Sequence, residues 1–275
     1  MNKEELLEKG RELQNVGNYK EAIKFFTQAL ALDPKYVKAY NLRGIAYSYL
    51  NDYEQAIYNL TRAIDFSPTD DHELYNNRGL CFHAIKNYDK ASDDFTCAIE
   101  LKPTSEEYYM NRGLTSLEQE DYRQAMYDFN QAVKLKPNYA MPHYYRGDLY
   151  MTFKDYESAI EDFDAAIATN KFFFEARRLR GLALYFMRRY KSAIEDFDEI
   201  LKVNVNDDTV YFYRGVSHYR LENFKRATED LTKAARTHSD FVEVFKYRGM
   251  AYEFLGEEEK ATADFLTAAV LDENS

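Results

Sequence analysis

This 275-residue sequence lacks long apolar runs, a set of cysteines large enough for a disulfide framework, and an excess of positive charge. No window approaches the roughly 18 consecutive apolar residues of a membrane-spanning helix, so we expect no membrane association. Two cysteines, Cys81 and Cys97, make no disulfide framework, and we interpret both as reduced packing residues. The net charge of −11 argues against nucleic acid as a partner. The N-terminal stretch MNKEELLEKG is charged and unlike a signal peptide, which predicts a cytoplasmic protein.

Residue patterns of enzyme chemistry are also lacking. Neither glycine-rich phosphate-binding motif, G-x-x-x-x-G-K-S/T or G-x-G-x-x-G, occurs. The histidines are scattered, and none is paired in sequence with a cysteine or carboxylate at metal-ligand spacing. The sequence therefore predicts no enzymatic activity, no metal site and no cofactor. The five histidines are His72, His83, His143, His218 and His238.

Glycine is scarce but regularly spaced. Of the ten glycines, eight recur at intervals of 34 residues, with a single interval of 35. An internal period of this length is typical of solenoid proteins. Because glycine within a helix costs roughly 1 kcal/mol relative to alanine, its recurrence indicates a packing requirement. The eight are Gly10, Gly44, Gly79, Gly113, Gly147, Gly181, Gly215 and Gly249.

Small and bulky residues follow each of these glycines in a constant register. An alanine stands twelve residues later, a phenylalanine or leucine sixteen residues later, and in seven cases a second alanine nineteen residues later. These spacings lie on one face of a helix. They predict two antiparallel helices per unit, which approach closely where glycine meets alanine, with the bulky residue filling the adjacent gap.

Turn residues agree with this pairing of helices. Gly17 and Gly256 each come seven residues after a regularly spaced glycine, where the first helix of a unit should end. Pro142 falls in the expected first turn of a helix, where proline is tolerated. Asparagine or aspartate precedes most second helices as a candidate N-cap, namely Asn18, Asp52, Asn87, Asp121, Asp155 and Asn223.

The order of aromatic residue, Gly, Tyr, Ala, Phe, Ala and Pro at this period resembles the tetratricopeptide repeat, and YNNRGLCFHAIKNYDKASDDFTCAIELKP (75–103) is a close instance. The resemblance covers the whole chain. It implies an all-α fold, a right-handed α-solenoid (superhelix) of eight helix-turn-helix units in a single domain over 1–275, with one inserted residue, Asp71. The repeats are 3–36, 37–70, 72–105, 106–139, 140–173, 174–207, 208–241 and 242–275.

An arginine precedes seven of the regularly spaced glycines, and an aspartate stands sixteen residues after six of these arginines. They are either a row of anion-binding sites or structural Arg–Asp pairs along the solenoid, and we favour the structural pairs. Repeat two has Arg43 and Asn59 instead. The six pairs are Arg78–Asp94, Arg112–Asp128, Arg146–Asp162, Arg180–Asp196, Arg214–Asp230 and Arg248–Asp264.

The resemblance implies a concave partner-binding surface, lined by the first helix of each repeat. Its second, fifth, ninth and twelfth residues form a stripe, which the sixth flanks. Asparagines in the first half can hold a peptide backbone, because an amide offers a donor and an acceptor, or they can simply face water. Aromatic residues in the second half can bind side chains or pack against the neighbouring repeat. The predicted peptide-binding residues are Asn41, Asn76, Asn77, Asn111, Tyr144, Arg178, Tyr185, Phe212, Tyr219, Arg220 and Lys246.

One binding mode of the family, a clamp of lysine, asparagine and arginine for chaperone C-terminal tails, is absent, and Glu73 would repel a carboxylate there. We therefore predict a protein–protein interaction scaffold that binds an extended peptide or partner segment in the concave groove. Two alternatives stay open. One is a self-assembling module, with a homodimer through the last helix, where Leu266 replaces the Thr, Asn or Asp of all other repeats. The other is a regulatory region of a larger enzyme complex.

Overall fold

A computed structural model describes residues 1–236 and 241–273 of the chain; His238 lies outside the described residues. This part of the protein is all-α, as predicted, and holds sixteen helices. They form two compact units, Met1–Pro137 and Asn138–Ser275. Among the described residues, no helix combines the length and apolar character needed to cross a bilayer.

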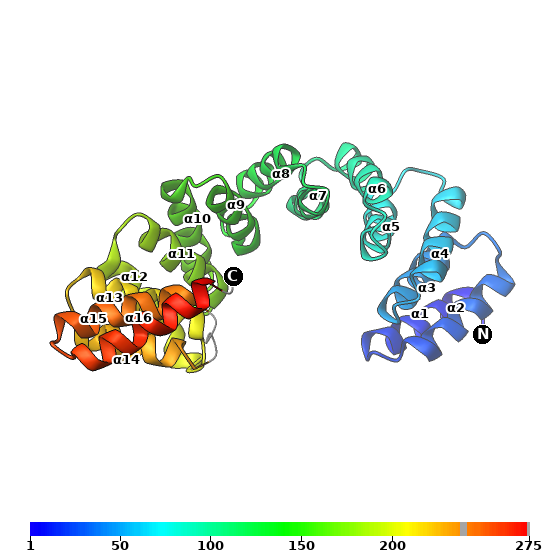
Figure 1. The fold of residues 1–275 in the computed structure, drawn as a ribbon. Helices are drawn as coiled ribbons and strands as arrows, with labels where there is room; N and C mark the ends of the chain where they lie inside the picture. Colours follow the sequence, from blue (N-terminus) through cyan, green and yellow to red (C-terminus); the bar gives the residue numbers. More distant parts are fainter. Residues whose placement is uncertain (237–240, 274–275) are drawn as a thin grey trace. The chain divides into compact units, whose positions relative to one another are not determined.

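The first unit consists of four helix pairs, in which each helix packs against the next one in the chain (Figure 1). Its helices are α1 (Lys3–Asn15), α2 (Tyr19–Leu32), α3 (Val37–Tyr49), α4 (Tyr53–Phe66), α5 (His72–Ala84), α6 (Tyr88–Leu101), α7 (Glu106–Glu118) and α8 (Tyr122–Leu135).

The second unit repeats this arrangement with four further pairs. Its helices are α9 (Ala140–Thr152), α10 (Tyr156–Thr169), α11 (Phe174–Phe186), α12 (Tyr190–Val203), α13 (Asp208–Arg220), α14 (Phe224–Ala234), α15 (Val242–Phe254) and α16 (Glu258–Glu273).

Each odd-numbered helix begins at the first residue of a repeat as the sequence divides them. Asp71, the inserted residue, is the N-cap of α5, and its carboxylate accepts a hydrogen bond from the backbone N–H of Glu73 at 2.9 Å. Pro142 is the third residue of α9, as expected for its first turn. Side-chain caps form at Asp52, Asn87, Asp121 and Asp155 but not at Asn18 or Asn223.

The regularly spaced glycines make room for the bulky residue of the paired helix. A Cβ added to Gly79 would lie 2.8 Å from Cε1 of Phe95, and one added to Gly113 would lie 2.7 Å from Cε1 of Phe129. Both rings are fully or almost fully buried. The bulky residue therefore fills the space beside the glycine, and its ring lies directly against that glycine. A Cβ added to Gly44 would also lie 3.2 Å from the backbone oxygen of Ala56, on the paired helix.

The first helices end in a left-handed residue, whether or not it is glycine. Gly17 and Gly256 have φ of 79° and 73°, as predicted for the helix ends. At the corresponding place the other repeats use a residue with a side chain at φ near 60°, which is sterically less favourable than glycine. These residues are Asn51, Lys86, Glu120, Lys154, Arg188 and Glu222.

Candidate functional site

The arginine before a regularly spaced glycine joins three helices in most repeats. In repeat four, Nε and Nη2 of Arg112 donate to the two carboxylate oxygens of Asp128 at 2.9 and 2.8 Å. The remaining Nη1 donates to the hydroxyl of Thr96, on the second helix of the preceding repeat, at 3.0 Å. Because Asp128 is fully buried, this guanidinium neutralises a carboxylate that has no access to water.

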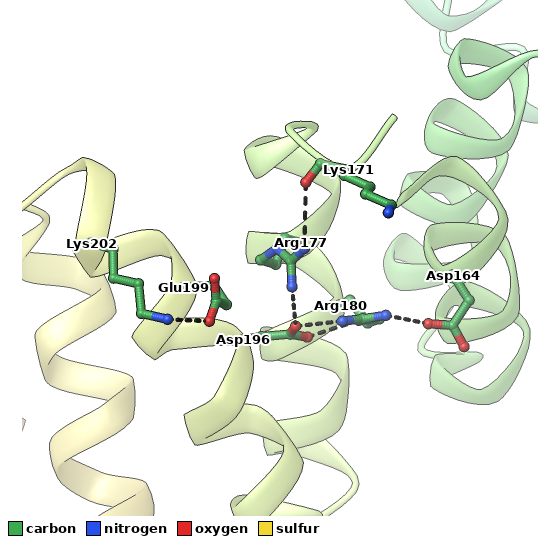
Figure 2. A network of polar contacts seen from close by, with 7 residues as sticks. All are labelled: Asp164, Lys171, Arg177, Arg180, Asp196, Glu199 and Lys202. Atoms are coloured by element: carbon green, nitrogen blue, oxygen red, sulfur yellow. Dashed lines mark hydrogen bonds and ion pairs between the residues drawn. The ribbon is translucent and has the colours of Figure 1, made fainter. Parts of the chain in front are cut away.

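All six predicted Arg–Asp pairs form in this two-pronged geometry, which confirms the structural interpretation. Figure 2 shows the most extended example: Arg180 lies between Asp196 of its own repeat and Asp164 of the preceding one. Arg177 adds a longer contact to Asp196, at 3.4 Å. The hydrogen-bonding groups of these arginines are thus engaged inside the protein, and they do not form a row of anion sites.

His143 belongs to the same layer of buried charge, which the sequence analysis missed. Its Nδ1 lies 2.9 Å from Oδ1 of Asp162, although the two residues are nineteen positions apart. The sequence pattern excluded only histidine pairs at metal-ligand spacing, and this pair does not have that spacing. Spacing along one helix could not reveal a contact between α9 and α10. Within residues 1–236 and 241–273, no three potential metal-ligating side chains come together.

The predicted asparagines form two amide pairs between first helices of neighbouring repeats. Asn77 donates to Oδ1 of Asn41 at 3.3 Å, and Asn111 donates to Oδ1 of Asn76 at 2.9 Å. Asn41, Asn77 and Asn111 are half-buried, whereas Asn76 is only 5% exposed. The expectation that Asn76 lies on an accessible surface was therefore wrong. Its buried side chain accepts the hydrogen bond from Asn111.

In the second unit, the fifth residue of a repeat contacts the residue that precedes the next first helix, 29 positions later. Tyr144 and Phe173 have ring centroids 4.9 Å apart, and so do Phe212 and Phe241. Arg178 forms an ion pair with Asp207 at 3.6 Å in the equivalent place. These contacts explain a second correction. Phe212 is only 6% exposed and packs inside the array, whereas it was expected to meet a partner.

The other predicted aromatic residues are half-buried and joined edge to face. Tyr185 lies 5.0 Å from Tyr213, and Tyr219 lies 5.6 Å from Tyr247, between ring centroids. Burial raises the pKa of Tyr185 to about 12, so its phenol stays neutral. The rings therefore both stabilise the repeat junctions and show part of their surface.

The basic residues of the stripe differ in their partners. Lys246 lies 3.4 Å from Asp272, an exposed ion pair, as Arg178 lies near Asp207. Arg220 instead donates to the phenol oxygen of Tyr247 at 3.0 Å, a neutral partner that leaves its charge uncompensated in that contact. Arg220 and Arg178 are exposed and Lys246 is half-buried, so all three can reach a ligand.

A hollow in the first unit lies between α3, α4 and α5, and no sequence pattern pointed to it. This α3–α5 cleft has a volume of about 600 Å3, within the usual range of ligand pockets. Its wall includes Asn77, one of the predicted peptide-binding residues. Cys81 also lines it, and burial raises the pKa of that thiol to about 12, which keeps it protonated and unreactive. The lining residues are Ile45, Ser48, Tyr49, Asn51, Tyr53, Leu60, Asn77, Leu80, Cys81 and Ala84.

Sequence profiles of the tetratricopeptide repeat match most of the chain, over residues 10–48, 37–70, 72–105, 113–152, 143–172 and 178–240. The chain belongs to the tetratricopeptide repeat family. Members of this family serve generally in protein–protein interactions, and they are scaffolds more often than enzymes. A search of curated proteins gives no match to this tetratricopeptide repeat chain.

Solved structures with the same fold include a tetratricopeptide repeat protein from Parabacteroides merdae, 21% identical, with a TM-score of 0.60, covering 86% of this chain and 93% of that one. The pilF protein of Pseudomonas aeruginosa is 19% identical, with a TM-score of 0.65 and coverage of 73% and 91%. YrrB, described as having an unusual peptide-binding site, is 22% identical, with a TM-score of 0.54 and coverage of 62% and 88%. At these identities the likeness establishes the fold alone.

Proposed function

We propose that this tetratricopeptide repeat protein is an interaction scaffold that binds an extended peptide or partner segment along the first helices of its repeats. The α3–α5 cleft carries the proposal. It combines apolar walls, suited to a side chain, with the amide of Asn77, suited to a peptide backbone. Among the described residues, Asn77 makes one hydrogen bond, to Asn41, so its carbonyl oxygen and second N–H are available to a ligand.

The second unit supports the same function with a different chemistry. Tyr144, Tyr185 and Tyr219 present partly exposed rings. Arg178 and Lys246 lie on the same stripe of first helices, and Arg220 directly follows the stripe residue Tyr219. Aromatic and arginine side chains are enriched among residues that dominate binding energy at interfaces. We expect this unit to contact apolar and acidic side chains of a partner. The peptide-binding site named for YrrB agrees with such a role.

The test is a peptide-display selection against the full chain, followed by calorimetry with several selected peptides. Asn77→Ala should weaken unrelated peptides to a similar extent, because the amide contacts backbone atoms that all of them share. Gln28→Ala is the matched control, since it removes an exposed amide from the second helix α2. Peptides that bind equally well to Asn77→Ala, or that lose affinity as strongly with Gln28→Ala, would exclude this surface as the site.

A second candidate is self-association through α16, which one observation favours. At the position of Leu266 other repeats carry threonine, asparagine or aspartate, and Thr27, Thr96 and Asp198 accept a hydrogen bond there from the arginine of the next repeat. Leu266 cannot accept one, and it is 63% exposed. An apolar surface therefore replaces the polar contact. Sedimentation velocity tests the idea: a dimer should form at high concentration and dissociate with Leu266→Asp, whereas a monomer unaffected by that change excludes it.

A further inference from the structure

Aromatic stacking joins successive repeats at three of the seven junctions. The first residue of a second helix is usually tyrosine or phenylalanine, and at these junctions a ring at the end of the next first helix stacks on it. The other four junctions have Ala84, Glu118, Thr152 and Arg220 at that place. Tyr19 stacks on Tyr49 with ring centroids 4.7 Å apart and planes within 5°. The same stacking occurs in two pairs of the second unit, Tyr156–Phe186 at 5.3 Å and Phe224–Phe254 at 4.4 Å.

At the junction of repeats two and three this ring is missing. Tyr53 is the first residue of α4, and the residue at the end of the next first helix is Ala84. Alanine is the smallest residue at this position in the eight repeats. In the part of the chain that the structure describes, no ring stacks on Tyr53. The α3–α5 cleft, lined by both residues, occupies the place that an aromatic side chain fills elsewhere.

The ring of Tyr53 is held in position for such a contact. Its hydroxyl donates to Oδ1 of Asn51 at 2.9 Å, and its body packs against the buried cluster of Leu60 and Cys81. Leu60 also leaves more of the cleft empty. Five other repeats have a fully or almost fully buried phenylalanine at the equivalent position, and leucine is smaller. The cleft is therefore preformed, and a ligand need not order it.

The charge of the cleft restricts the occupant. None of its ten lining residues is charged, although 30% of the residues in the chain are. A carboxylate or an ammonium group would lose hydration in the cleft without meeting a counter-charge. A neutral ring would instead stack on Tyr53 and contact Leu60 and Leu80. Ring pairs of this kind contribute beyond the area that they bury.

We propose that the α3–α5 cleft binds a neutral aromatic side chain of the partner, stacked on Tyr53, while Asn77 binds the adjacent peptide backbone. The inference rests on the proposed function, since it identifies the residue class that anchors the peptide in the first unit. The ligand would in this way supply the ring that Tyr49, Phe186 and Phe254 supply at three other junctions.

The test uses the full chain and two capped tripeptides, acetyl-Gly-Phe-Gly-amide and acetyl-Gly-Leu-Gly-amide, titrated by two-dimensional NMR. We expect the phenylalanine peptide to bind about fivefold more tightly than the leucine peptide. Its signal changes should centre on Tyr53, Leu80 and Ala84. Equal affinities, or changes centred elsewhere, would overturn the proposal.

Ala84→Phe is the decisive variant, because it supplies the ring that Phe186 and Phe254 provide at their own junctions. We expect it to raise the melting temperature and to lower the affinity for the phenylalanine peptide at least tenfold. Ala168→Phe is the matched control, since it adds the same ring to an exposed position of α10 and should leave that affinity unchanged. Tyr53→Leu should remove the preference for phenylalanine over leucine while the chain stays folded.

Failure of this inference can be told apart from failure of the proposed function. If the display-selected peptides require Asn77 but bind Ala84→Phe as tightly as the parent protein, the scaffold function stands and the aromatic anchor is wrong. If Asn77→Ala has no effect on those peptides while Ala84→Phe abolishes tripeptide binding, the cleft binds an aromatic group and the backbone contact is wrong.

Discussion

The Arg112–Asp128 pair offers the sharpest test of how charge is held inside this array. Asp128 is fully buried, and the Arg112 side chain is 12% exposed. Removing one partner of a buried ion pair typically costs about 3–5 kcal/mol, because the other charge stays behind without compensation. Arg112→Leu should cost about 4 kcal/mol, since it strands a carboxylate that cannot reach water. Asp128→Leu should cost about 3 kcal/mol, because the longer arginine can reorient toward solvent.

The double variant should be milder than either single one. Two leucines leave no stranded charge, and replacing a buried ion pair by apolar residues is often neutral, so we expect a loss of about 1–2 kcal/mol. The two single losses sum to about 7 kcal/mol, which implies a coupling free energy of about 5 kcal/mol. Urea unfolding, followed by circular dichroism, gives the free energy of unfolding of the parent protein, the two single variants and the double variant. An m value that is the same in all four indicates that the repeats unfold together.

The exposed pair Lys24–Glu21 is the matched control on the same unit. Its side chains are 65% and 45% exposed, so the same double-leucine cycle should give a coupling below about 1 kcal/mol. A pH series adds an independent check. Burial raises the pKa of Asp128, while hydrogen bonds from Arg112 counteract that shift. The Arg112→Leu variant should regain stability as pH falls, because protonation removes the stranded charge. Additive single losses at Arg112 and Asp128 would refute the reasoning.

Three further predictions concern packing, backbone strain and pH. Gly79→Ala should lower the free energy of unfolding by about 1–2 kcal/mol in urea titrations, because the new Cβ would lie 2.8 Å from the buried Phe95 ring, and an unchanged midpoint would exclude tight packing there. Lys154→Gly should raise thermal stability by up to about 1 kcal/mol by relieving φ of 60°, whereas a loss would mean that the side chain stabilises the turn. Burial lowers the pKa of His218, so its contribution to stability is present above its unfolded value near 6.5 and is lost as pH falls; His218→Leu should flatten the melting temperature between pH 7 and 5.

The repeat register and the Arg–Asp pairs could be predicted from sequence because they depend on spacing within a single period. Each arginine and its aspartate face one another across a helix pair, and this pair has the same geometry in every repeat. The spacing of sixteen residues therefore identifies the contact wherever both residue types occur. The hydrogen bond from arginine Nη1 to the preceding repeat is harder to predict, because its acceptor is threonine in some repeats and aspartate in others.

Exposure of the stripe residues could not be predicted in the same way. Tyr144 and Phe212 occupy the same fifth position, yet one is half-buried and the other almost fully buried. The ring centroid of each lies 4.9 Å from that of the residue that precedes the next first helix, Phe173 or Phe241, a contact that its position on the helix does not reveal. A helical period fixes which side of a helix a residue lies on, but not what an adjacent loop places upon it. A spacing of 29 residues between paired aromatic or charged residues is the signal that could have revealed these contacts.

The junction of repeats two and three combines several departures from the repeat pattern, and their proximity favours a functional origin. Asp71 is inserted there, Asn59 replaces the paired aspartate, Leu60 replaces the usual phenylalanine, and Ala84 replaces the larger residue that every other repeat has at its place. Arg43 accordingly bonds Asn59 by Nε alone, at 2.7 Å, and not with the two prongs seen in other repeats. Apart from the inserted Asp71, each of these residues is smaller or less charged than its counterpart in most other repeats. Ala84 leaves the preformed cleft open beside Tyr53, where Phe186 and Phe254 place a ring at their own junctions. The space beside Tyr53 is therefore available to a ligand, which is the basis of the proposed aromatic anchor.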